Sequence, residues 1–197
     1  MPVHLLDLND GHPNRGTAAI VALVEGAGQR AATHDVRRAG ALPPPGPAPW
    51  ILGGGPGSPL QAGPWRGPLL AALGSRLAAN LPTLGICFGM EMLALALGAT
   101  ARPLGQPREG LHPVQLLREQ HDDPLLHDLH GELAYEQRHW GMHGGRGTVV
   151  AMGPERDVAA FRHGRSWGVI FHPEADFGEP TRAVFSAVIP RFLSLSG

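Results

Sequence analysis

The chain has 197 residues, of which 43% are hydrophobic, and this length and composition fit one α/β domain with a sizeable core. Its net charge of −1 gives no reason to expect a nucleic-acid partner or an anionic membrane surface, and the absence of lysine excludes a catalytic or P-loop lysine. The single cysteine excludes an intramolecular disulfide and a multi-cysteine zinc site.

The start of the sequence gives no signal for export or membrane insertion. The first residues lack a basic segment followed by an apolar one. No stretch approaches the roughly 18 uninterrupted apolar residues of a spanning helix. We therefore expect a cytoplasmic protein without a membrane partner.

Short apolar runs alternate with longer alanine- and leucine-rich segments in the first half of the chain. The short runs predict strands at residues 3–8, 50–52 and 82–86. The longer segments predict helices at residues 17–28, 69–81 and 88–97. In the last of these, one face carries Met90, Leu93, Ala94 and Leu97. This order predicts an α/β three-layer sandwich, in which a mainly parallel, doubly wound (flavodoxin-like) sheet has helices on both faces.

The second half of the chain changes character. Its β-like runs predict an added antiparallel β region that extends the sheet, around residues 114–117, 147–152, 158–162 and 167–171. Residues 182–195 predict a closing helix interrupted by Pro190. The proline-rich residues 40–49 predict a surface loop, because too few residues precede them to form a separate domain. We expect residues 1–197 to form a single domain.

Cys87 stands where a predicted strand meets a predicted helix, with Gly85 and Gly89 two residues to either side. This is the layout of a nucleophile elbow, with cysteine in place of serine. The sharp turn strains the backbone of the nucleophile and needs small neighbours, and the helix N-terminus behind it stabilises a thiolate. The Phe88 N–H would point at the same place. The motif alone leaves open a buried, unreactive thiol.

A base for the thiol is expected at His172. The predicted strand before it ends near Pro173, which cannot donate to a sheet ladder. Side chains two residues apart point the same way in extended backbone, so Glu174 can hold one imidazole nitrogen while the other faces the thiol. A histidine and a glutamate in solvent are the alternative, since the chain has 11 histidines.

The glycine-rich residues 53–58 follow another predicted strand and can expose several backbone N–H groups to an oxyanion. A phosphate-binding loop is excluded because no Gly-Lys-Ser/Thr follows, and the spacing does not fit a dinucleotide fingerprint. An ordinary loop is the remaining alternative.

These motifs, in this order, resemble the class I glutamine amidotransferases. The resemblance covers nearly the whole chain and rests on four segments: residues 52–58 for the oxyanion loop, residues 85–89 for the elbow, residues 171–174 for the His-Pro-Glu segment and, more weakly, residues 138–141 for a loop that contacts the amino-acid end of glutamine.

The resemblance implies hydrolysis of glutamine to glutamate and ammonia, without a metal or another cofactor. Cys87 would attack the amide, His172 would act as acid and base, and Glu174 would orient His172. The oxyanion would be held by the Gly55 and Phe88 N–H groups. The implied substrate-binding residues are Gly57, Glu91, Arg138, His139 and Trp140.

Two positions depart from the family pattern. Glu91 replaces the usual glutamine, and a carboxylate there would attract the substrate ammonium and repel its carboxylate. Glutamate at this place resembles the γ-glutamyl hydrolases, so a stand-alone hydrolase of γ-glutamyl peptides or conjugates is the alternative function. Glu91 could also face solvent or favour the helix N-terminus. Arg138 replaces a small polar residue and could pair with a substrate carboxylate or with Glu91.

No synthetase segment is visible in the sequence, so ammonia from glutamine would be used by a separate synthase subunit. A catalytically silent regulatory module is a less favoured alternative. The histidine- and aspartate-rich residues 118–130 could suggest a metal site, but their mixed polarity and Pro124 favour a solvated loop.

Overall fold

A computed structural model of the chain describes residues 1–10, 15–175 and 181–197. Its main sheet has seven strands in the order β2-β1-β3-β4-β9-β8-β7. Their bounds are β1 Val3–Asp7, β2 Ala31–Asp35, β3 Trp50–Leu52, β4 Thr83–Ile86, β7 Thr148–Met152, β8 Val158–His163 and β9 Ser166–Val169. The strands from β2 to β9 in this order pair in parallel. Strand β8 pairs antiparallel with both β9 and β7. The expected mainly parallel sheet with an antiparallel extension is confirmed.

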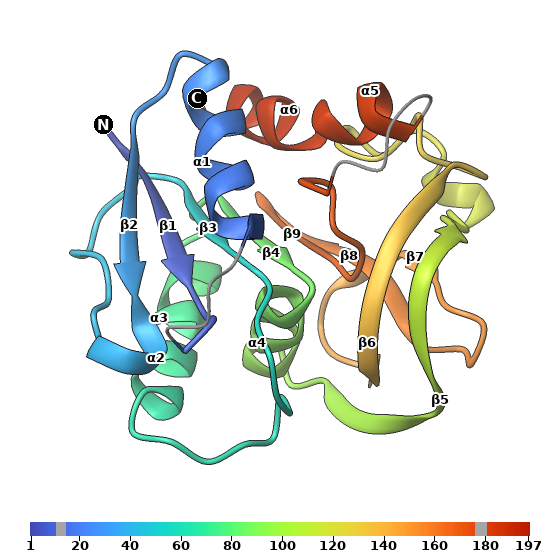
Figure 1. Ribbon diagram of the computed structural model, residues 1–197, viewed down its shortest axis with the longest axis horizontal. Helices are drawn as coiled ribbons and strands as arrows, with labels where there is room; N and C mark the ends of the chain where they lie inside the picture. Colours follow the sequence, from blue (N-terminus) through green and yellow to red (C-terminus); the bar gives the residue numbers. More distant parts are fainter. Residues whose placement is uncertain (11–14, 176–180) are drawn as a thin grey trace.

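Helices cover both faces of the main sheet. They are α1 Arg15–Gly26, α2 Val36–Ala39, α3 Arg66–Ala78, α4 Phe88–Ala96, α5 Thr181–Ser186 and α6 Val188–Leu195, with a 3-10 turn at Arg118–Gln120. Figure 1 shows α1, α5 and α6 together on one side of the sheet and α3 with α4 on the other. Every residue of β3, β4 and β9 is buried between these layers, as is typical of central parallel strands.

A second, two-stranded antiparallel sheet pairs β5 (Thr100–Pro113) with β6 (Leu133–His143). Figure 1 shows this ribbon beside β8 and β7, at the opposite end of the molecule from β2. No sequence pattern predicted these two strands, nor β2 and α2. The run at residues 114–117 is no strand, since it contributes one bridge between Leu116 and Ala151.

Several helix boundaries differ from the expected ones, and α1 spans Arg15–Gly26 in place of residues 17–28. Helix α3 begins three residues before residue 69 because Pro68 is tolerated in a first helical turn. The closing helix is broken at Ala187 and not at Pro190. Pro190 is the third residue of α6, where an N–H would have no partner within the helix.

Helix α4 is buried on every side, and the expectation of one apolar face was too narrow. All residues from Phe88 to Ala94 are buried, including Glu91. The helix packs against β4, β9 and β3 and also against α3 and β5, so it has no solvent-facing side over these residues.

No helix in the described part of the chain is long and apolar enough to cross a membrane.

Candidate active site

Three neighbouring parallel strands end at one edge of the sheet. The order β3-β4-β9 brings together the glycine-rich turn after β3, Cys87 after β4 and His172 after β9. The carboxyl edge of an open α/β sheet is where such folds bind ligands. A cavity of about 430 Å³ opens there. Its lining residues are Asn9, Gly54, Gly55, Pro56, Gly57, Cys87, Phe88, Glu91, Gln137, Arg138, His139, Trp140 and His172.

The backbone at Cys87 has the strained geometry of a nucleophile elbow. Its φ of 51° and ψ of −113° lie in a region that residues other than glycine rarely adopt. The Cys87 N–H donates to the Val169 carbonyl at 2.8 Å, which fixes the turn to the end of β9. A Cβ on Gly85 would lie 2.7 Å from the Gly89 oxygen, and one on Gly89 would lie 2.4 Å from the Leu52 oxygen. The two flanking glycines are therefore required by close packing.

The thiol of Cys87 is nearly buried and is surrounded by backbone from other segments. Its sulfur lies 3.7 Å from the Gln137 carbonyl oxygen of β6. The glycine turn approaches from another side. A Cβ on Gly54 would lie 2.9 Å from His172 Cε1 and 3.6 Å from Cys87 Cβ. Only glycine fits this position without displacing the cysteine–histidine pair.

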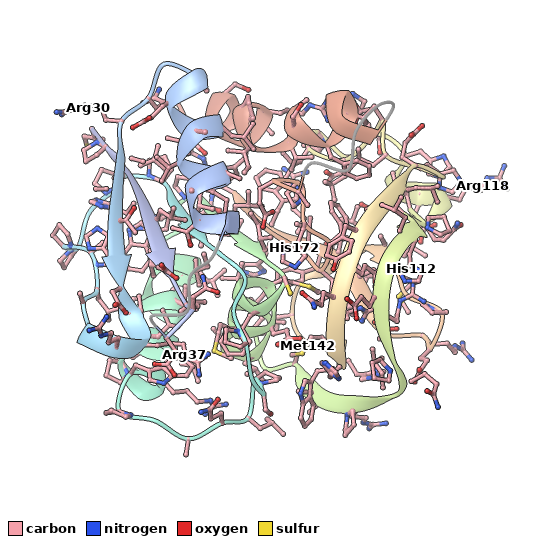
Figure 2. All side chains as sticks on the ribbon, viewed as in Figure 1. Arg30, Arg37, His112, Arg118, Met142 and His172 are labelled. Atoms are coloured by element: carbon pink, nitrogen blue, oxygen red, sulfur yellow. The ribbon has the colours of Figure 1, made fainter. Side chains whose placement is uncertain are left out.

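His172 and Glu174 meet as expected, but the backbone that joins them is a turn and not an extended strand. Strand β9 ends at Val169, and the Ala175 N–H donates to the His172 carbonyl at 3.2 Å. Nδ1 of His172 lies 2.8 Å from Oε1 of Glu174. The His172 N–H donates to the Tyr135 carbonyl at 2.9 Å, so β6 also fixes the histidine. Figure 2 shows His172 near the middle of the molecule.

The electrostatics of the pair favour a charged histidine. Burial lowers the pKa of His172, but the neighbouring Cys87 and Glu174 outweigh burial and raise that pKa well above its usual value. His172 is thus held as an imidazolium between a sulfur and a carboxylate, which is the form a thiolate partner requires.

The two expected oxyanion donors line the same cavity. Phe88 is the first residue of α4, so its N–H has no partner within the helix. Gly55 packs so tightly on the end of β1 that a Cβ there would lie 2.3 Å from the Leu8 oxygen. Gly57, the neighbouring member of the turn, has a φ of 105°, which glycine adopts without strain.

Glu91 faces the cavity, as the substrate-binding interpretation expected, and the alternative of a solvent-facing glutamate is wrong. Its residue is only 3% exposed. Burial raises the pKa of Glu91 to about 8, although the nearby charge of Arg138 opposes the shift. Glu91 is therefore mostly a neutral acid at pH 7, and the expected repulsion of a substrate carboxylate is weak.

Arg138 lies on strand β6 and not in a loop, and its partner is not Glu91. Its Nε donates to Glu136 at 2.7 Å and its Nη1 donates to Asp157. Burial lowers the pKa of Arg138, but Glu136 and Asp157 raise it above its usual value. Its Nη2 has no hydrogen-bond partner among the described residues. The next two residues, His139 and Trp140, also line the cavity from β6.

Sequence reasoning missed two polar residues of the cavity. Asn9 follows β1 at the same sheet edge, and its side chain donates to Asp7 at 2.7 Å. Its position directly after the apolar run at residues 3–8 was the available signal. Gln137 lines the cavity, and its backbone carbonyl lies near the Cys87 sulfur, which no sequence pattern predicts.

The histidine- and aspartate-rich segment at residues 118–130 does not form a metal-ligand cluster. The rings of His121 and His130 lie with their centres 4.4 Å apart. Within the described residues, no three histidine, cysteine, aspartate or glutamate side chains are grouped to hold a metal ion.

The known proteins to which this chain is similar point to one family. A sequence model described as "Glutamine amidotransferase class-I" matches residues 33–189. The carbamoyl phosphate synthase small chain of Maricaulis maris is 33% identical over 178 residues, which are 82% of this chain and 40% of that protein. A "GMP synthase [glutamine-hydrolyzing]" of Thermus thermophilus is 36% identical over 138 residues, which are 65% of this chain and 25% of that protein. The chain thus spans less than half the length of these relatives.

A solved structure of a glutamine amidotransferase from Thermotoga maritima has the same fold. It superposes with a TM-score of 0.83 over 99% of this chain and 97% of that chain, at 16% sequence identity.

Proposed function

The chain belongs to the class I glutamine amidotransferase family, and from that premise we propose that it hydrolyses the side-chain amide of free glutamine through a thioester on Cys87. The observation that carries the proposal is the meeting of a strained Cys87, a charged His172 and a buried Glu174 at the edge of one cavity. A structural cysteine needs neither the strained backbone nor the charged partner.

In the first proposed step, the Cys87 thiolate attacks the γ-carbonyl carbon of glutamine. The carbonyl oxygen becomes an oxyanion and accepts hydrogen bonds from the Gly55 and Phe88 N–H groups, each worth about 3 kcal/mol in sites of this kind. His172 then gives its proton to the amide nitrogen, the carbon–nitrogen bond breaks, and ammonia leaves behind a γ-glutamyl thioester.

In the second proposed step, neutral His172 takes a proton from water, which attacks the thioester. Glutamate leaves, and the thiolate–imidazolium pair is restored. Glu174 holds Nδ1 of His172 throughout, which fixes the ring orientation and stabilises the charge that returns to it.

The state of Glu91 favours free glutamine over a γ-glutamyl conjugate. A neutral carboxyl group offers one donor and one acceptor, as the amide of a glutamine would, and it does not repel a substrate carboxylate. Arg138 lines the same cavity, and its positive charge can attract that carboxylate. We propose that Gly57, His139 and Trp140 complete the binding surface.

We further propose that residues 1–197 act as one glutaminase domain whose ammonia is used by a separate synthase subunit in the cytoplasm. The support is the identity of the relatives, which are a carbamoyl phosphate synthase small chain and a glutamine-hydrolysing GMP synthase.

An ammonia-release assay of the purified chain tests the proposal. Free glutamine, a γ-glutamyl peptide and a γ-glutamyl amine are compared for wild type and Glu91→Gln. We expect glutamine to be the best substrate of both proteins. Preference for γ-glutamyl conjugates would support the alternative hydrolase, and no hydrolysis by the isolated or lysate-supplemented protein would support a silent regulatory module.

A further inference from the structure

A buried arginine beside the proposed glutaminase site takes no part in the steps above. Arg37 lies on the four-residue helix α2, and its side chain is only 3% exposed. Figure 2 shows Arg37 between α2 and α4 in this view. A buried guanidinium is costly unless its hydrogen bonds are made, so its partners indicate what it holds in place.

The hydrogen bonds of Arg37 join the glycine turn to the end of β1. Nη1 donates to the Leu8 carbonyl at 3.2 Å and to the Pro56 carbonyl at 2.5 Å. Nη2 donates to Oε1 of Gln61, five residues further along the loop, at 3.1 Å. Pro56 lies between Gly55 and Gly57, which line the cavity, so Arg37 holds the backbone of that turn.

The same guanidinium also contacts the nucleophile elbow. Its central carbon lies 5.5 Å from the centre of the Phe88 ring and 5.2 Å from that of the Trp65 ring. Phe88 carries one proposed oxyanion donor and Gly55 carries the other. Arg37 therefore contacts one donor residue directly and the turn that contains the second.

The hydrogen bond to Pro56 also fixes a peptide orientation. In a trans peptide the carbonyl and the following N–H point in opposite directions, so the Gly57 N–H points away from Arg37. Gly57 has a φ of 105°, and a peptide next to glycine can flip at little cost. A flip here would break a charge-assisted bond inside the protein, which opposes it.

We propose that Arg37 is a positioning residue that holds the Gly55–Gly57 turn and Phe88 in the geometry that the oxyanion requires. The inference rests on the proposed glutaminase function. Misplacement of catalytic groups by about 1 Å costs roughly 100-fold in rate.

Arg76 provides a matched control. It is also a buried arginine, and it stacks on Trp50 with 4.2 Å between its central carbon and the ring centre. Its guanidinium donates to the Ala48 and Pro82 carbonyls at 2.8 Å each. These carbonyls lie at the amino ends of β3 and β4, on the edge of the sheet opposite the site. Both arginines are buried and donate to backbone carbonyls, although Arg37 also lies 3.6 Å from a carboxylate oxygen of Asp10. Of the two, only Arg37 contacts the oxyanion segments.

The test compares Arg37→Met, Arg37→Lys and Arg76→Met in the full chain. Glutamine hydrolysis, the fraction of folded protein and hydrogen exchange of residues 53–61 are measured for each. In Arg37→Met we expect kcat/KM to fall about 100-fold, mainly through kcat, and the turn amides to exchange faster. Alkylation of Cys87 by iodoacetamide, which needs no oxyanion donor, should change less than about twofold.

The other variants keep the test decisive. Arg37→Lys retains the positive charge but not the planar guanidinium, so we expect its kcat/KM to fall less than that of Arg37→Met. This variant still tests the inference if Arg37→Met does not fold. Arg76→Met should lose thermal stability while kcat/KM per folded molecule stays within about twofold of wild type. An equal loss in Arg76→Met, or unchanged kcat/KM in both Arg37 variants, would overturn the inference. If wild type hydrolyses no glutamine, the proposed function fails, and unchanged exchange in residues 53–61 of the Arg37 variants then overturns the positioning role independently.

Discussion

Nδ1 of His172 lies 2.8 Å from Oε1 of Glu174, and this contact leaves the other imidazole nitrogen for Cys87, which also interacts with the ring. The strand before the histidine ends at Val169, so the contact depends on a turn at residues 172–175 and on the hydrogen bond from the His172 N–H to Tyr135. The Glu174 carboxylate therefore orients the imidazole of a histidine whose backbone is already fixed by hydrogen bonds.

Replacement of the carboxylate should weaken the charged histidine without changing the shape of the site. In Glu174→Gln we expect kcat/KM for glutamine to fall about 100-fold. Glu174 helps to raise the pKa of His172, so its loss lowers that pKa and moves the decline of activity at high pH toward lower pH. A pH–rate profile of both proteins checks the shift. A profile that only drops in height, with its basic limb unmoved, would contradict this role.

Glu91 should make the free energy of unfolding depend on pH. Its pKa is raised from 4.5 when exposed to about 8 in the folded protein, so the folded chain keeps a proton that the unfolded chain loses. The free energy of unfolding should therefore fall as pH rises from about 4.5 to about 8. At pH 7 the loss is about 3 kcal/mol, from 2.5 pH units at about 1.36 kcal/mol each.

The matched variant for this prediction is Glu91→Gln, which has no proton to lose. Urea unfolding of both proteins at pH 5 and pH 7 measures the effect. The variant should lose less stability between these pH values than wild type does, while the contribution of His172 remains in both. Equal losses in the two proteins would show that Glu91 is ionised in the folded state.

The strained backbone of Cys87 predicts the order of two substitutions. Cys87 is the N-cap of α4, where glycine is favoured over alanine, and at a φ of 51° and a ψ of −113° glycine also avoids the strain. Cys87→Gly should therefore be more stable than Cys87→Ala by about 1 kcal/mol. Thermal and urea unfolding of the two inactive variants give the difference. Gly74→Ala in helix α3 is the control, because a Cβ there meets nothing within 4 Å, and the substitution should stabilise by up to about 1 kcal/mol.

Arg138 should matter more for stability than an exposed ion pair does. Its loss leaves Asp157, which is 0% exposed, without its ion-pair partner, while Glu136 keeps only its pair with Arg108. Arg138→Met should lower the free energy of unfolding by about 3 kcal/mol or more. Arg191→Met removes a partly exposed pair with Asp128 and should cost about 1 kcal/mol. Similar losses in the two variants would contradict the view that burial sets the cost.

The sequence was sufficient for the parts of the site that follow apolar runs. Cys87 and the turn at residues 53–58 each come directly after a short buried strand, and a parallel sheet brings such ends together. Glycine spacing indicated the elbow because the packing there allows no side chain. The resemblance to a known family joined these pieces to His172 and Glu174.

Other features of the fold and the site, such as strand β5 and the burial of Glu91, depend on contacts between distant segments that no local sequence pattern shows. Strand β5 carries Pro103, Gly105 and Pro107, and all of its residues are exposed or only partly buried, so its sequence has no apolar alternation. Glu91 is buried because α4 packs against α3 and β5 as well as against the main sheet, and the apolar face predicted for the helix did not indicate these contacts.

Helix α2, which carries Arg37, was missed for a different reason. Asp35 caps it by accepting from the Arg38 N–H at 3.0 Å, and Gly40 ends it in a left-handed conformation. These are ordinary helix signals, but the helix has only four residues, too few for a periodic pattern.

Covalent labelling of Cys87 by a glutamine analogue tests the central claim most directly. A diazoketone analogue of glutamine is incubated with the wild-type chain, and the site of modification is found by peptide mass spectrometry. We predict one adduct per chain, on Cys87, formed more slowly when free glutamine is present and absent from Cys87→Ala. A folded wild-type chain that gains no adduct, or one whose labelling glutamine does not slow, would contradict the proposal that this cavity binds glutamine against a reactive thiol.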